Sequence, residues 1–149
     1  MIRQKLLFKL VNLYPPFLGA GIRVKVSPDI KTIDVTLKLT PFNRNYVGTQ
    51  YGGSIYSMCD PFYMILLMEN LGRDYIVWDK SAKITFKKPG KSRLHARFHI
   101  PESQYQDIKV QLEQKDTILP VFSVDVLDKE GQVVATVDKT IYLKKKPVT

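Results

Sequence analysis

Residues 43–61 read NRNYVGTQYGGSIYSMCDP and join a loop to the start of a long apolar segment. The Asn and Gly content indicates a loop that ends at the paired Gly52 and Gly53. The segment 54–71 follows, and as a helix it would extend roughly 27 Å at 1.5 Å per residue. It carries few polar groups, which predicts a helix buried on most sides. Gly72 suits its C-terminal end.

Segments on both sides of this helix alternate apolar and polar residues, which is the period of strands with one buried face. The alternation covers residues 33–39, 82–87, 94–100, 121–127 and 133–143. The turn sequence KPGK predicts a hairpin of the second and third of these strands. The turn sequence DKEG predicts another hairpin, made of the fourth and fifth.

Two further helices are predicted outside the strands. The capping-box pair Ser103 and Gln106 favours a helix over 103–115, with a strand as the alternative there. Residues 1–16 are predicted to form a short amphipathic helix that the two prolines at its end terminate. This helix is expected to pack on its own domain, and contact with a membrane surface is the alternative.

The order of these elements predicts an α+β fold in which an antiparallel sheet buries one face on a central helix. The chain has 149 residues, of which 44% are hydrophobic and 25% are charged. This length and composition predict a single folded domain over 1–149.

The formal net charge of +9 favours an anionic partner: nucleic acid, a membrane surface or a phosphate-bearing small molecule. No helix-turn-helix or zinc module is legible, so nucleic acid is not expected. The lone Cys59 excludes an intrachain disulfide and favours a reducing compartment, with the cytoplasm as the expected location. Its thiol is expected to be an inert part of the core.

Targeting and metal signals are weak. Lys9 and Asn12 interrupt the apolar run that a signal peptide needs, and no segment has the apolar length of a membrane span. Integral membrane association is therefore not expected. His95 and His99 share a strand face but would lie about 13 Å apart, too far to bind one ion together. No metal site is predicted.

The loop and the acid after it form a pattern of Asn45, Gly48, Tyr51, Gly52 and Gly53, with Asp60 seven residues after the second glycine. This pattern resembles the NxxGxxHGG loop of hotdog-fold thioesterases of the phenylacetate-degradation type, and the resemblance covers the chain from about residue 30 to its end. The stretches PPFLGAGIRV, NRNYVGTQYGGSIYSMCDP and YIVWDKSAKITFKKPG are most similar to a group of hotdog proteins of unassigned function.

The resemblance implies a hotdog fold, with the antiparallel sheet wrapped around a long central helix. It also implies a homodimer or tetramer whose sites lie between the helix of one subunit and the neighbouring chain. The implied activity is hydrolysis of an acyl thioester such as acyl-CoA, with coenzyme A as part of the substrate and no separate cofactor. Asp60 would be general base or nucleophile, and the Gly53 N–H, more than that of Gly52, would hold the oxyanion. Apolar surroundings would raise the pKa of Asp60.

Local sequence leaves a second role open for Asp60, as the N-cap of a helix that begins at Pro61. Tyr51 stands where the family commonly has His, and a phenol can donate a hydrogen bond but cannot take up a proton near neutral pH. Tyr51 could instead be an aromatic packed at the loop base. The rival function is a non-catalytic hotdog protein that binds an acyl-CoA or lipid-like ligand.

Four more residues are candidates for contact with substrate. Asn45 would bond substrate or water, or else tie the loop backbone. Gln50 and Ser57 are expected to be polar neighbours of Asp60, with Ser57 one helical turn before it. Met64 could line an acyl pocket, or simply belong to the core.

Basic residues follow the central helix at Lys83, Lys87 and Lys88. In hotdog thioesterases this region often meets the phosphates of coenzyme A, so the resemblance assigns these lysines to substrate binding. A solvated basic face is the alternative.

Overall fold

The computed structural model describes residues 10–147. Its helices are η1 (Val11–Leu13), α2 (Pro15–Ala20), α3 (Gly52–Ser57), α4 (Phe62–Leu71) and α5 (Glu102–Gln114). Its strands are β1 (Ile22–Val26), β2 (Thr32–Leu37), β3 (Tyr75–Phe86), β4 (Leu94–His99), β5 (Thr117–Ile118), β6 (Val121–Leu127) and β7 (Val133–Lys145). The strands form one seven-stranded antiparallel sheet of order β1-β2-β4-β6-β7-β3, and β5 pairs with β7 beside this path.

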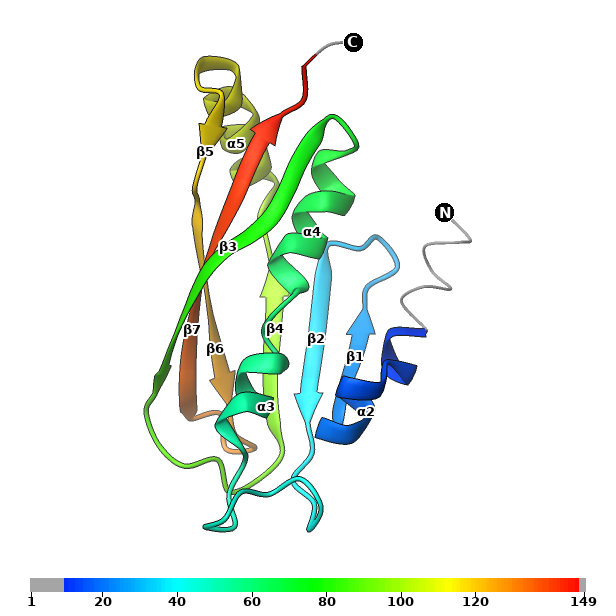
Figure 1. The fold of residues 1–149 in the computed structure, drawn as a ribbon, viewed down its shortest axis with the longest axis vertical. Coiled ribbons are helices and arrows are strands. Elements are labelled where there is room, and N and C mark those ends of the chain that lie inside the picture. Colours follow the sequence, from blue (N-terminus) through cyan, green and yellow to red (C-terminus); the bar gives the residue numbers. More distant parts are fainter. Residues whose placement is uncertain (1–9, 148–149) are drawn as a thin grey trace.

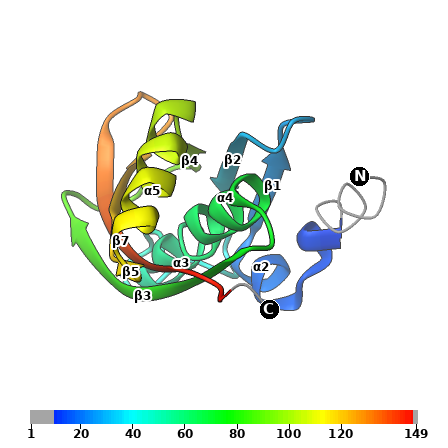
Figure 2. The same cartoon turned by 90° about the horizontal axis from the view of Figure 1, so that it is seen from above.

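The sheet curves around the helical segment, as predicted for an α+β chain. Figure 2 shows α4 inside the curve, with β1 and β2 on one side and β3 and β7 on the other. Leu66 and Leu67 of α4 are fully buried against the inward faces of the strands. In β2, buried Ile33, Val35 and Leu37 alternate with half-buried residues, so the period of two predicted from the sequence is confirmed.

The segment 54–71 is helical but interrupted. α3 ends before residues 58–61, the backbone tightens there, and Pro61 has no N–H with which to continue the hydrogen-bond ladder. α4 then ends at Gly72, whose φ of 96° lies outside the range that other residues adopt easily, as predicted for its C-terminal end. The break leaves Asp60 outside both helices.

The predicted hairpin of 82–87 with 94–100 is wrong. The first segment belongs to β3, which pairs along its whole length with β7, and the second is β4, which pairs with β2 and β6. In Figure 1 the KPGK segment connects strands that are not neighbours. Alternation identifies a strand but not its partner, and only β7, with 13 residues, matches the 12 residues of β3 in length.

The other predicted hairpin is confirmed, since β6 and β7 are antiparallel neighbours joined by the DKEG turn, with a register shift between Val126 and Leu127. α5 confirms the helix predicted over 103–115. Its capping box is wrong, because the N-cap is Pro101 and the Gln106 amide donates to Glu102 at 3.1 Å instead. Neither β1 nor β5 was among the predicted strands.

The predicted N-terminal helix over 1–16 lies mostly outside the described residues. Where the chain is described, the 3₁₀ helix η1 ends at Leu13, just before the prolines, and Pro15 and Pro16 then begin α2. Proline fits the first turn because the N–H groups there have no intrahelical acceptor.

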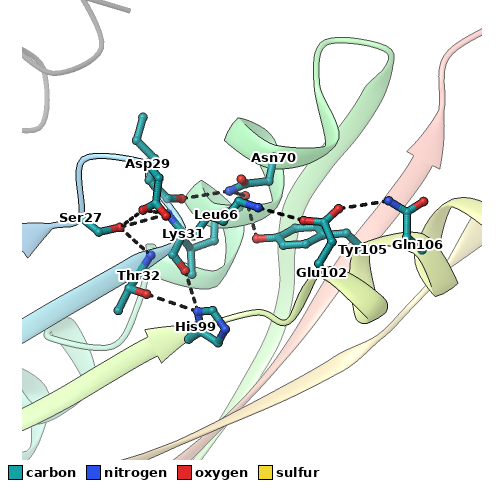
Figure 3. Close-up of polar contacts among 11 residues, drawn as sticks. Ser27, Asp29, Lys31, Thr32, Leu66, Asn70, His99, Glu102, Tyr105 and Gln106 are labelled. Carbon is teal, nitrogen blue, oxygen red and sulfur yellow. Dashed lines mark hydrogen bonds and ion pairs between the residues drawn. The ribbon is translucent and has the colours of Figure 1, made fainter.

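A polar cluster fastens the C-terminal end of α4 to the turn before β2 and to α5 (Figure 3). The Asn70 amide donates to the carbonyl oxygens of Ile30 at 3.0 Å and Leu66 at 2.8 Å. Ile30 has a φ of 56°, a conformation that β-branched residues rarely adopt. Lys31 forms an ion pair with Glu102 at the start of α5, with 3.0 Å between Nζ and Oε2. These contacts fix the far end of α4, the helix that begins just after Asp60.

Candidate active site

Asp60 lies in the break between α3 and α4 with its side chain 47% exposed. Its Oδ1 accepts hydrogen bonds from the Tyr56 hydroxyl at 2.7 Å and from Lys139 Nζ at 2.9 Å. The capping alternative is contradicted, because the N-cap of α4 is Pro61 and no side chain makes a capping bond there. Within the described chain, no hydrogen bond reaches Asp60 Oδ2.

Lys139 of β7 is the buried centre of this cluster. Its side chain is 0% exposed and forms ion pairs with Asp60 and with Asp79 of β3, the latter at 3.1 Å. The same Nζ lies 3.3 Å from the Tyr56 hydroxyl and 5.4 Å from the centre of that ring. One ammonium thus bridges two carboxylates that come from different parts of the chain.

The electrostatics differ from the prediction for Asp60. Burial raises its pKa, but the hydrogen bonds from Tyr56 and Lys139 and the Lys139 charge together outweigh burial and hold the pKa below its usual value. The prediction of a raised pKa is therefore wrong. For Asp79 burial dominates over the contact with Lys139, so its pKa is raised. Burial lowers the pKa of Lys139, and the two carboxylates more than reverse that effect, so its pKa is raised.

The glycine pair begins α3 next to a surface groove of about 720 Å³. The N–H groups of Gly52 and Gly53 belong to the first turn, where a helix offers them no acceptor. Tyr51 is 58% exposed, and its ring lies over Gly53, where a Cβ would come within 2.4 Å of the ring. The groove is lined by Tyr51, Gly53, Tyr56 and Ser57 among others, and Tyr56 is the residue whose hydroxyl bonds Asp60.

The remaining loop candidates bond the loop itself. The Asn45 amide donates to Thr49 Oγ1 at 2.9 Å and to the Gln50 carbonyl at 3.2 Å, while Asn45 Oδ1 accepts from the Thr49 N–H at 2.9 Å. Gln50 is 3% exposed, and its amide donates to the carbonyls of Leu37 at 3.3 Å and Ser92 at 3.0 Å. Both side chains therefore hold the loop that carries the glycine pair, and Gln50 makes no bond to Asp60.

Two helical candidates lie close to Asp60 in sequence but do not bond it. Ser57 donates to the Gly53 carbonyl within α3 at 2.8 Å, and it is Tyr56, one residue earlier, whose hydroxyl reaches the acid. Met64 is half-buried and packs against the hydrophobic core. Cys59 is fully buried, and burial raises the pKa of its thiol to about 12, which confirms an inert core thiol.

The three lysines differ in their surroundings. Lys83 is exposed on β3, and Lys87 and Lys88 line a second groove of about 430 Å³ together with Gly52 and Phe86. Lys88 Nζ is engaged by Asp128 at 2.5 Å and by Gln132, whereas Lys87 is exposed. Among the residues that the structure describes, no group of three potential metal ligands occurs.

Sequence reasoning missed Tyr56, Asp79 and Lys139. One signal was present: Lys139 stands at an inward position of an alternating strand, between buried Val137 and Ile141. A lysine at such a position needs a buried anionic partner. Nothing local indicated which carboxylate would meet it.

Solved structures share this fold at low sequence identity. PA5026 from Pseudomonas aeruginosa, a protein of unknown function named "Probable Thioesterase", has a TM-score of 0.82 at 16% identity, over 95% of each chain. Thioesterase HI1161 from Haemophilus influenzae has a TM-score of 0.65 at 12% identity, over 91% of this chain and 86% of its own. A mutant of the phenylacetic acid degradation protein PaaI from Thermus thermophilus has a TM-score of 0.58 at 18% identity, over 86% and 97%. The fold is therefore that of the hotdog thioesterases.

A family model described as "Domain of unknown function (DUF4442)" matches residues 3–143. No curated protein matches the chain in sequence. Over residues 10–147, no helix combines the length and apolar character needed to cross a membrane.

Proposed function

Because the chain belongs to the DUF4442 family and has the hotdog fold, we propose that it hydrolyses an acyl thioester, with acyl-CoA as the substrate and Asp60 as the reacting carboxylate. The observation that supports this most is the state of Asp60: its side chain is half exposed, both hydrogen bonds that the described residues give it reach Oδ1, and its partner Tyr56 lines the groove. A carboxylate in this state can react at neutral pH.

The lowered pKa keeps Asp60 ionised at neutral pH, which both nucleophilic attack and general-base catalysis need. In the nucleophilic route, Asp60 Oδ2 would bond to the carbonyl carbon, the C–S bond would break, and the thiolate would leave. Water would then hydrolyse the acyl anhydride and restore the carboxylate. General-base attack by water remains the second route through the same oxygen.

The developing oxyanion would accept a hydrogen bond from the Gly53 N–H, with Gly52 as the less favoured donor. Tyr51, exposed over Gly53, would donate its phenol to the same carbonyl in place of the family's histidine. Asn45 and Gln50 would act by holding this loop. Ser57 and Met64 would lie along the acyl path, Ser57 on the groove wall.

The substrate's phosphates would meet the basic residues after the helix. Lys87 is exposed in the second groove beside Gly52, and Lys83 is exposed on β3, so both could contact polyphosphate. Lys88 would contribute only by giving up part of its contact with Asp128. This placement matches the chain's net charge of +9 to a polyanionic ligand in the cytoplasm.

A second copy of the chain would complete the site. Within residues 10–147, β3 is a 12-residue edge strand with one side unpaired, on which the same strand of a partner could pair. Large apolar side chains are exposed on β3 and on the loop before α3, namely Trp78, Phe42, Tyr46 and Val47. We therefore propose a homodimer, which could pair again into a tetramer.

One observation favours the rival function of an acyl-CoA binder without catalysis: Tyr51 cannot exchange a proton near neutral pH. A panel of acyl-CoAs from acetyl to palmitoyl, with aromatic acyls included, separates the two. The proposal expects thiol release from one class of acyl group. A rise in melting temperature with acyl-CoA but no thiol release would establish the binder instead.

A further inference from the structure

We infer that Lys139 is a positioning residue, which fixes Asp60 as a carboxylate and reserves Oδ2 for the substrate. The inference rests on the proposed function, since it assigns Asp60 to the reaction. It goes further by giving a role to Lys139 and to Asp79, neither of which would touch the substrate.

The hydrogen-bond pattern supports this assignment first. Both donors to Asp60, the Tyr56 hydroxyl and Lys139 Nζ, bind the same oxygen, Oδ1. The carboxyl group is thereby held by one oxygen while its side chain stays 47% exposed. Two donors on one oxygen restrict rotation of the carboxyl group and direct the other oxygen away from them.

The burial of Lys139 supports it next. A fully buried ammonium is costly for folding, and in this strand its neighbours on the inward face are Val137 and Ile141. A buried ion pair is often no more stabilising than apolar side chains of similar volume. The stability of the fold therefore gives little reason for a lysine at this position. The need to keep Asp60 ionised does give a reason.

Asp79 accounts for the ammonium's own position. It approaches Lys139 from β3 at 3.1 Å and is only 26% exposed. Lys139 is thus held between two carboxylates, the more exposed Asp60 and the less exposed Asp79. The groups that face Asp60 are Tyr56 on α3, Lys139 on β7 with Asp79 behind it on β3, and the adjacent Cys59 thiol, which stays neutral.

The test compares two substitutions in the set Asp60, Lys139 and Asp79, one that removes the lysine and one that removes the second carboxylate. The Cγ signal of Asp60 would be followed by NMR in protein with ¹³C-labelled aspartate, and the Asp60→Asn variant assigns that signal. In Lys139→Met we expect the pKa of Asp60 to rise by about one to three units. In Asp79→Asn, Lys139 keeps Asp60 as its ion-pair partner and loses the other carboxylate, so the pKa of Asp60 should stay unchanged or fall.

Tyr56→Phe removes the other donor to Asp60 and keeps Lys139, so it provides a second test if the Lys139→Met variant does not fold. Loss of its hydroxyl should raise the pKa of Asp60, by less than Lys139→Met does. In the activity readout, kcat/KM of Lys139→Met should drop on going from about pH 8 to about pH 5 by about two- to sevenfold relative to wild type, because a carboxylate whose pKa is raised by about two units is partly protonated at pH 5.

An unchanged pKa of Asp60 in Lys139→Met, or an equal rise in Asp79→Asn, would overturn the inference and leave the lysine a structural role. The titration needs no turnover. If the wild type released no thiol, the proposed function would fail while the titration still decided the role of Lys139.

Discussion

At the scale of single residues, the glycine pair matters because of what lies over it. A Cβ on Gly53 would come within 2.4 Å of the Tyr51 ring, closer than real Cβ contacts allow. Tyr51 is exposed, so the ring can swing aside without disturbing the core. A side chain at position 53 would therefore displace the Tyr51 ring at the surface without affecting the stability of the fold.

This displacement of the ring predicts the behaviour of Gly53→Ala. The fold and melting temperature should be close to wild type, while the displaced ring and the narrowed approach to the Gly53 N–H should lower thiol release by about tenfold or more. Circular dichroism and the thioesterase assay would be run on the same preparation. A variant with wild-type turnover would show that substrate does not approach the backbone at this glycine.

The sequence made Asp60 a candidate but did not reveal the residues that bond it. The family resemblance pointed to Gly53 and Asp60, because its pattern lies within one short stretch of the chain. Lys139 is 79 residues from Asp60 in sequence, and their contact depends on which strands pair. The predicted pKa had the wrong direction for the same reason, since an apolar neighbourhood was assumed and a buried ammonium was present.

At the scale of elements, α4 is fixed at its far end by the polar cluster of Figure 3. The Asn70 amide bonds the carbonyl of Ile30, a residue in a strained left-handed conformation, and that of Leu66. If Asn70 is removed, the Ile30 carbonyl loses this donor and the turn loses its anchor, whereas the Leu66 carbonyl keeps the Tyr105 hydroxyl at 3.4 Å.

We expect Asn70→Ala to lower the free energy of unfolding by about 1–2 kcal/mol. The matched control is Gln106→Ala in the same cluster, which removes an exposed bond to Glu102 and should cost within about 0.5 kcal/mol. Urea unfolding measures both. Equal losses in the two variants would mean that the Ile30 turn does not depend on Asn70.

The positions of the strands were predictable, because the alternation of apolar and polar residues reveals them. The pairing of the strands was not, because it depends on contacts between distant segments. Alternation identified β2, β4, β6 and β7, and the DKEG turn joined the last two correctly. The KPGK segment looked like a similar turn, yet β3 pairs with β7, a strand of similar length that lies far from it in sequence. The break in the helical segment follows from Pro61, whose missing N–H ends the ladder.

At the scale of the whole molecule, the open edge of β3 leads to a prediction about assembly. If two copies pair through this strand, a further charge on it would meet its own copy across a two-fold axis. Ser81→Lys places such a charge at an exposed position of the strand. The variant should shift the protein from dimer or tetramer toward a monomer of 17.2 kDa in sedimentation experiments.

The control is Val110→Lys, which adds the same charge at an exposed position of α5, away from β3. Its assembly should match wild type. A wild-type chain that sediments as a monomer would contradict the proposed dimer, and with it the expectation that a second copy completes the site.

The central claim is that Asp60 performs the hydrolysis, and the most direct measurement is the rate of thiol release by wild type and Asp60→Asn on the same acyl-CoA. Asparagine keeps the shape of the side chain but supplies no nucleophilic carboxylate. The account predicts a loss of about a hundredfold or more with a cooperative melt retained. A folded Asp60→Asn variant that releases thiol at the wild-type rate would contradict it.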